Sequence, residues 1–186
     1  MNAKKVKSFF AIIFRSHKSP EQLEITARVC YDTKNDKGTY AMTERLYYKD
    51  AHMKTFTARV LACTPGKHGY DVVLDRTCFY PEGGGQPGDT GTLSGVSVTD
   101  THERGGEIVH YCSAPLTPGA QVEGQIDWAR RQSLMQLHSG EHILSGLAHK
   151  HFGYENVGFH MGAEFVTIDL SGPLEESQLA LLEREA

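Results

Sequence analysis

The spacing of apolar residues along the chain changes at Trp128, and this change constrains the fold more than any other feature. Between about Thr55 and Asp127, short runs alternate apolar and polar residues and are separated by Gly- and Pro-bearing turns, a pattern typical of strands. The runs are "TFTARVLAC", "YDVVLD", "GTLSGVSVTDT", "EIVHYCS" and "QVEGQIDW", with "TPGKHG" as the first turn. Several short strands at this spacing predict a small β-barrel or closed meander.

After Trp128 the spacing becomes helical. The residues that follow the helical period are Leu134, Leu137, His138, Glu141, Leu144, Ser145 and Ala148. The segment "GFHMGAEFVTIDL" then predicts a strand or hairpin, and "GPLEESQLALLEREA" predicts a helix with Pro173 in its first position. The predicted class is therefore α+β, with a barrel domain at 42–127 and a second domain at 128–186. Residues 1–41 show no sustained period, and we treat them as an N-terminal extension of unknown role.

Composition narrows the class of protein. Of the 186 residues, 39% are apolar and 23% are charged, which is ordinary for a soluble protein. The longest apolar run, "FFAIIF" at 9–14, is too short to cross a bilayer. The net charge is −4, so a polyanionic partner would need local basic groups, for which the candidates are Arg45, Lys49, Lys54 and Arg59. The four cysteines (Cys30, Cys63, Cys78 and Cys112) form no C-x-x-C pair, which predicts a reducing, cytoplasmic compartment.

One segment inside the barrel region, "CFYPEGGGQPGDTG" at 78–91, fits no strand. Its consecutive glycines, Gly83, Gly84 and Gly85, allow positive φ and a close approach of the backbone to a ligand. Gln86 and Asp89 add polar side chains to the same loop. A tight turn between barrel strands is an equal alternative. A phosphate-binding loop is excluded, because no Lys-Ser/Thr pair follows the glycines.

The string "HSGEH" at 138–142 is the strongest candidate for a metal site. His138 and His142 are four residues apart, so on a helix they share one face and can hold one metal ion. The string also fits H-x-x-E-H, the zinc motif of inverted metalloproteases, in which Glu141 would be the general base. Two histidines that merely share a helix face are the third possibility.

Three segments together favour one family. "FYPEGGGQPGDTG", "DWARRQSLMQLHSGEHILSG" and "GFHMGAEFVTIDL" resemble the alanyl-tRNA editing proteins, the free-standing relatives of the editing domain of alanyl-tRNA synthetase. The resemblance extends from about Met42 to Ala186. It implies a small β-barrel followed by the first part of an α/β editing domain of the alanyl/threonyl-tRNA synthetase type. It also implies hydrolysis, in trans, of tRNA(Ala) that carries serine or glycine.

The same resemblance assigns roles to residues. It makes His138 and His142 the first half of a Zn²⁺ site. It implies three catalytic residues, Gln86, Ser139 and His160, of which the first two would favour the hydroxyl of serine. The substrate-binding residues that it implies are Gly83, Gly84, Gly85, Asp89, Arg130 and Arg131.

The family completes its zinc site with a Cys-x-x-x-His pair well downstream. No cysteine follows Cys112 in this sequence, so we expect an incomplete site, a chain that is truncated at its C-terminus, and weak zinc binding. Three alternatives stay open. They are a non-catalytic remnant that binds tRNA or another partner, an H-x-x-E-H metalloprotease, and a fragment of a full alanyl-tRNA synthetase, whose ATP-binding core would precede it.

Overall fold

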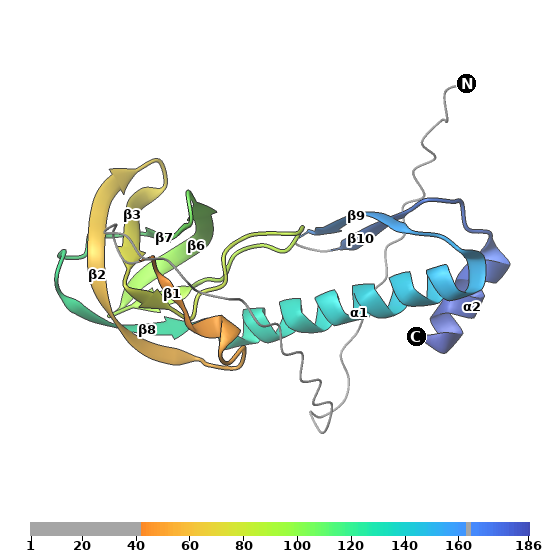
Figure 1. Cartoon of the computed structure of the whole chain (residues 1–186), viewed down its shortest axis with the longest axis horizontal. Helices are drawn as coiled ribbons and strands as arrows, with labels where there is room; N and C mark the ends of the chain where they lie inside the picture. The colour runs from red at the N-terminus through yellow and green to blue at the C-terminus, as the bar shows by residue number, and fades with distance from the viewer. Residues whose placement is uncertain (1–41, 163–164) are drawn as a thin grey trace, which may run out of the picture.

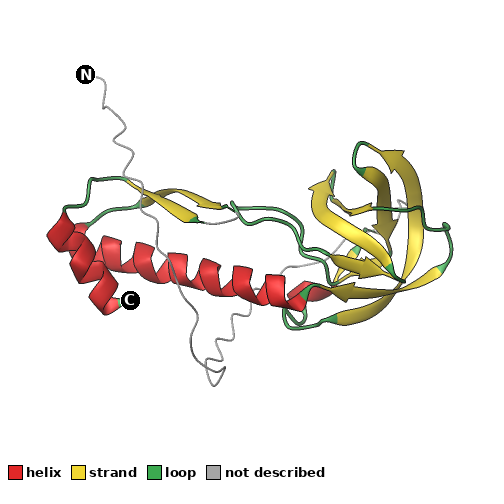
Figure 2. Ribbon diagram, turned by 180° about the vertical axis from the view of Figure 1, so that it is seen from behind, coloured by secondary structure: helices red, strands yellow, loops and turns green. Residues whose placement is uncertain are grey.

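The computed structural model describes residues 42–162 and 165–186, and two parts of the molecule are plain in Figure 1. Strands wrap into a barrel at one end, and a long helix, α1 (Trp128–Phe152), leads away from it. Seen from behind in Figure 2, a hairpin of strands lies alongside this helix, and a short helix packs at its far end. The predicted α+β class is confirmed. The predicted extension at 1–41 lies outside the described residues.

Six strands form a closed barrel in which every neighbouring pair is antiparallel. In order around the barrel they are β2 (Thr55–Gly66), β3 (Gly69–Leu74), β7 (Glu107–Cys112), β6 (Val96–Arg104), β5 (Gly91–Leu93) and β8 (Gln121–Ile126). Beside the barrel, β1 (Glu44–Arg45) pairs in parallel with β4 (Arg76–Thr77), and a 3₁₀ turn, η1 (Leu46–Tyr48), follows β1. These strands account for the alternating runs of the sequence.

One expected strand is in fact two. The run at 91–101 divides into β5 and β6, which are joined by Ser94 and Gly95 at φ values of 48° and 85°. Two positive φ values in a two-residue turn suit the twist of a hairpin, and a serine there disguises the turn in the sequence. The prediction of a continuous strand was therefore wrong at this point.

The barrel core follows from the alternation of apolar residues. Along β2, the side chains of Phe56, Ala58 and Val60 are buried and their neighbours are exposed.

Two cysteines lie in the same core. Burial raises the pKa of the Cys78 thiol to about 11 and that of Cys112 to about 12. Both thiols are therefore protonated and unreactive at neutral pH, and they form no disulfide with the described residues.

A histidine lies inside this core. His110 on β7 is fully buried, with Nε2 2.8 Å from the hydroxyl of Thr77 and Nδ1 3.1 Å from the carbonyl oxygen of Val72. Nδ1 therefore donates to the carbonyl, and Nε2 accepts from the hydroxyl. Burial lowers the pKa of His110 to about 4, which keeps the ring neutral in the folded protein.

This histidine makes stability depend on pH. In the unfolded chain His110 has a pKa of about 6.5, so below this pH its imidazole binds a proton that it does not bind in the folded protein. The free energy of unfolding therefore falls as the pH drops from 6.5 toward 4. We expect His110 to remove about 2–3 kcal/mol between pH 7 and pH 4.5. The check is urea unfolding of the wild type and of His110→Gln at both pH values. An equal loss of stability in the two proteins would contradict the assignment.

Helix α1 has a clear start and a clear end. The side chain of Asp127 accepts a hydrogen bond from the backbone N–H of Arg130, and Gly153 ends the helix at a φ of 69°. At 1.5 Å per residue the helix is about 37 Å long, so it carries its middle turns well beyond the barrel. Its buried residues are Arg131, Leu134, Glu141, Leu144 and Ala148.

The hairpin consists of β9 (Asn156–Met161) and β10 (Val166–Leu170), as the sequence predicts. The last helix, α2 (Glu176–Glu185), packs Leu182 against Leu144 and Ala148 of α1. It begins three residues later than predicted, because Glu175 and Gln178 form a capping box, and Pro173 lies in the preceding loop. In the part of the chain that the structure describes, no helix is both long enough and apolar enough to cross a membrane.

Candidate functional site

The glycine loop, residues 78–90, leaves the barrel and extends beside α1 to the hairpin (Figure 1). At its tip, Gly83 and Gln86 exchange two backbone hydrogen bonds of 3.1 and 3.0 Å around Gly84 and Gly85. Gly84 and Gly85 have φ values of 59° and 83°, which explains why glycine is needed there. The N–H of Met161 at the end of β9 donates to the carbonyl of Gly85 at 2.9 Å. The loop is thus a tight turn that also docks on the hairpin.

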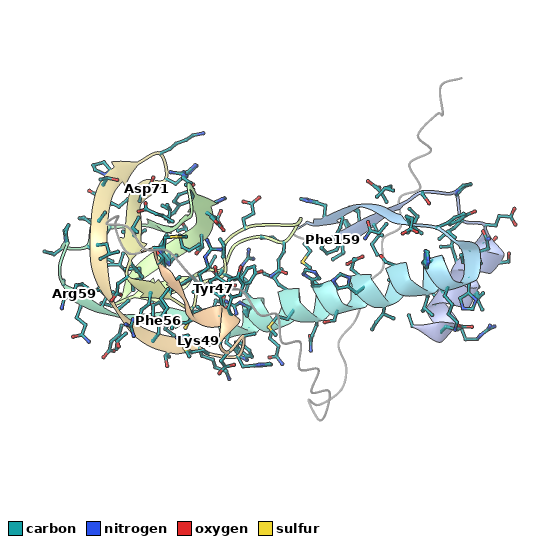
Figure 3. The ribbon with its side chains drawn as sticks, in the orientation of Figure 1. Tyr47, Lys49, Phe56, Arg59, Asp71 and Phe159 are labelled. Carbon is teal, nitrogen blue, oxygen red and sulfur yellow. The ribbon has the colours of Figure 1, made fainter. Side chains whose placement is uncertain are left out.

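This docking brings the two sequence motifs together. Gln86 is buried, and its Oε1 lies 2.8 Å from Nδ1 of His138 on α1. The ring of Phe159 on β9, labelled in Figure 3, lies 5.6 Å from the ring of His138, measured between centroids. His138 is therefore held between the loop and the hairpin.

His142 lies one turn further along α1. The two imidazole rings are 4.8 Å apart between centroids, and Nδ1 of His142 is 3.2 Å from Oε2 of Glu141. With the hydrogen of each ring on Nδ1, His138 donates to Gln86, the Nδ1–H of His142 lies beside the Glu141 carboxylate, and both Nε2 lone pairs remain free. Burial lowers the pKa of His138, and the neighbouring His142 lowers it further, whereas Glu141 opposes the change. Burial and the neighbouring His142 therefore both favour the neutral form of the His138 ring, which is the form that binds a metal.

The donor set fits part of a zinc site. His138, Glu141 and His142 offer ligand atoms that all lie within 4.8 Å of one another. Histidines that bind a metal usually donate their other ring N–H to a carboxylate or carbonyl oxygen. His138 does so with Gln86, and the carboxylate of Glu141 lies 3.2 Å from Nδ1 of His142. Two imidazole nitrogens on one helix face supply half of a tetrahedral zinc site. Two other histidines of α1 lie outside the group, because His149 pairs with Glu155 and His151 with Glu185.

Two residues with predicted catalytic roles lie apart from this group. The hydroxyl of Ser139 is exposed and donates to the carbonyl of Met135, 3.0 Å away in the preceding turn. His160 is exposed on β9 and follows Phe159, so strand alternation directs it to the other face of the hairpin. The structure brings Gln86 to the histidine pair but not Ser139 or His160.

Asp89 and Arg131, which the sequence predicts to bind substrate, pair with each other inside the protein. They are 2% and 3% exposed and form a buried ion pair in which Nε of Arg131 lies 2.9 Å from both carboxylate oxygens. The other guanidinium nitrogens donate to the carbonyl oxygens of Ala51 and Cys78, at 3.0 and 2.7 Å. With every guanidinium nitrogen engaged inside the protein, this pair anchors the loop to the start of α1.

Arg130 and the tip glycines remain candidates for substrate contact. Arg130 reaches the carbonyl of Gly88 over a long 3.4 Å hydrogen bond, at the base of the loop. Gly83 and Gly84 have open space where a Cβ would lie, so the tip offers its backbone to a ligand.

Neither the place of Phe159 beside His138 nor the burial of Glu141 was predicted. An acidic residue on the apolar stripe of α1, between Leu134 and Leu144, was the available signal for Glu141. For Phe159, which contacts His138 across 21 positions of sequence, no local pattern was available.

Comparison with known proteins gives one family. Residues 7–130 match the family model described as tRNA synthetases class II (A), a range that ends before His138. The chain is 37% identical over 151 residues to the alanyl-tRNA editing protein AlaX-L of Pyrococcus horikoshii. This alignment covers 77% of this chain and 37% of that protein. It is 35% identical over 153 residues to the alanyl-tRNA editing protein Aarsd1 of Mus musculus, covering 75% of this chain and 37% of that protein.

A third relative is the alanine–tRNA ligase of Pyrobaculum neutrophilum, 46% identical over 107 residues, or 55% of this chain and 12% of the ligase. The chain thus spans little more than a third of the editing proteins that it matches. The range of the family match includes the glycine loop and the first residues of α1. The chain belongs to the class II (A) tRNA synthetase family and, within it, to the alanyl-tRNA editing proteins.

Proposed function

We propose that this protein hydrolyses, in trans, tRNA(Ala) that carries serine or glycine. The contact between Gln86 and His138 is the observation that carries the proposal, because it joins the glycine loop to the histidine pair. An aminoacyl-tRNA is an ester that is already labile. A site therefore needs only to position water and to stabilise the developing oxyanion.

Each group has a role in this proposal. His138 and His142 would hold zinc through Nε2, and zinc supplies a Lewis acid that orients the amino acid or lowers the pKa of water. Gln86 fixes His138 through Oε1, and its amide NH₂ is a donor for the hydroxyl of a bound serine. The open tip at Gly83 and Gly84 and the guanidinium of Arg130 would contact the tRNA near its acylated end. The domains proposed are the barrel at 42–127 and the editing segment at 128–186.

The protease alternative is less well supported. A general base must face the water that it activates, whereas the carboxylate of Glu141 is buried and accepts hydrogen bonds from its neighbours. The metal-ligating group around the histidines also contains no second carboxylate among the described residues.

The test is deacylation of Ser-tRNA(Ala), Gly-tRNA(Ala) and Ala-tRNA(Ala) by the purified protein. We expect serine to be removed at least about 100-fold faster than alanine, because a site that binds the hydroxyl discriminates against its absence. Gln86→Ala should reduce this ratio, whereas Gln136→Ala, on the exposed face of α1, should leave it unchanged. Equal rates on serine and alanine would sink the proposal. Binding of tRNA(Ala) without any deacylation would favour a non-catalytic module.

A further inference from the structure

Glu141 is a buried acid on the inward face of α1. It is 5% exposed and lies on the same stripe of α1 as Leu134 and Leu144. A carboxylate is almost never buried in this way unless hydrogen bonds or opposite charges compensate for the lost water. The partners of Glu141 therefore explain why it is there.

Two of these partners fix one carboxylate oxygen. Oε1 accepts hydrogen bonds from the hydroxyl of Ser145 and from the side-chain amide of Asn156, each at 2.5 Å. The amide of Asn156 also lies 3.2 Å from the Ser145 hydroxyl, and its carbonyl oxygen accepts from the N–H of Gly158 at 2.9 Å. Ser145 belongs to α1, and Asn156 is the first residue of β9. The network thus ties the carboxylate to both the helix and the hairpin.

The second oxygen, Oε2, lies beside a candidate metal ligand. Oε2 lies 3.2 Å from Nδ1 of His142, whose side chain is otherwise 71% exposed. An exposed imidazole has several rotamers and two neutral tautomers, and only one tautomer leaves Nε2 free for a metal. Because Ser145 and Asn156 hold the carboxylate, Oε2 presents a fixed acceptor to Nδ1.

We propose that Glu141 is a positioning residue that selects the orientation and the tautomer of His142 for metal binding. Through Asn156, it also couples this ligand to the docking of the hairpin. The inference rests on the metal site of the proposed function. Coupling between two sites is reciprocal, so bound metal should stabilise the docked hairpin as much as the docked hairpin strengthens metal binding.

Glu141→Gln tests the proposal with almost no change in shape. To keep its hydrogen bonds from Ser145 and Asn156, the new amide must place its oxygen toward them and its NH₂ toward Nδ1 of His142. An NH₂ group there favours the tautomer with hydrogen on Nε2, which has no lone pair for a metal on that nitrogen. We expect zinc affinity, measured by competition with a chromophoric chelator in the absence of tRNA, to fall about 10- to 100-fold.

The matched control is Glu155→Gln, which removes the same charge from an exposed carboxylate that pairs with His149. Its zinc affinity should equal that of the wild type. Asn156→Ala leaves Glu141 intact but removes its link to the hairpin, and a smaller loss of affinity is expected. Equal affinity for zinc in Glu141→Gln and the wild type would overturn the proposal.

A metal-free measurement separates this inference from the proposed function. The ¹⁵N chemical shifts of the imidazole nitrogens report the tautomer of His142 directly. We expect the Nδ1–H tautomer in the wild type and in Glu155→Gln, and the Nε2–H tautomer in Glu141→Gln. If the wild type takes up no zinc but the tautomer changes as expected, the metal site fails and the positioning role of Glu141 stands. An unchanged tautomer would reject the role of Glu141, whatever the result with zinc.

Discussion

Replacing Arg131 with methionine should lower the free energy of unfolding by about 3–5 kcal/mol, the largest change in stability expected for the described residues. The substitution leaves Asp89 at 2% exposure without its countercharge, although the N–H of Tyr80 still donates to it at 2.7 Å. An isolated buried carboxylate is far more costly than a buried ion pair. Urea unfolding at pH 7 measures the loss.

Two further variants make this test specific. Asp89→Leu combined with Arg131→Met removes both charges, and most of the lost stability should return. Arg130→Met changes the neighbouring arginine, which makes one long hydrogen bond to Gly88 and has a buried Nε with no partner among the described residues. It should change stability by less than about 1 kcal/mol. A double variant that is as unstable as Arg131→Met would refute the charge argument.

Gly85→Ala should produce the largest loss of activity. A Cβ on Gly85 would lie 2.3 Å from the carbonyl oxygen of Phe159, a backbone atom that cannot rotate away, so the loop tip and the hairpin must separate. Gln86 then moves from His138, and a displacement of about 1 Å at a catalytic group costs about 100-fold in rate. The expected deacylation rate of Gly85→Ala is therefore about 100-fold below that of the wild type.

Gly119→Ala is the control, because its φ of 85° matches the 83° of Gly85 while no atom lies near its Cβ. Both variants carry the strain of a positive φ, and only Gly85→Ala carries the clash. A readout that does not depend on activity is hydrogen exchange of the Met161 amide, which donates to Gly85. Its exchange should accelerate in Gly85→Ala alone. Equal exchange in the two variants would show that strain, and not the clash, decides the result.

Local patterns account for what could be predicted from the sequence. Alternation along β2 placed Phe56 and Val60 in a core, and a spacing of four placed His138 and His142 on one helix face. These signals depend only on the period of a strand or a helix. The glycine loop was recognised in the same way, because no period fits it.

Contacts between distant segments could not be predicted in this way. Arg131 is 42 positions from Asp89, and Gly85 lies even further from the Met161 that it binds. In the sequence, Arg130 and Arg131 at the start of the helix look like two surface arginines. The burial of Arg131 becomes visible only when the glycine loop packs against it in the structure. The contact of Glu141 with Asn156 is a further example, because the two residues belong to different elements.

The glycine loop is fastened at two points, to the first turn of α1 by Arg131–Asp89 and to the hairpin by Gly85–Met161. Helix, loop and hairpin therefore form a closed frame, in which the loop acts as a brace across the angle between the barrel and the helix. A single helix would let a small tilt at Trp128 grow with distance, and His138 lies about 15 Å along its axis. Because the glycine loop is continuous with the barrel strands, the same tilt would also displace Gln86 relative to α1. A tilt of the barrel relative to α1 would therefore strain the contact between Gln86 and His138.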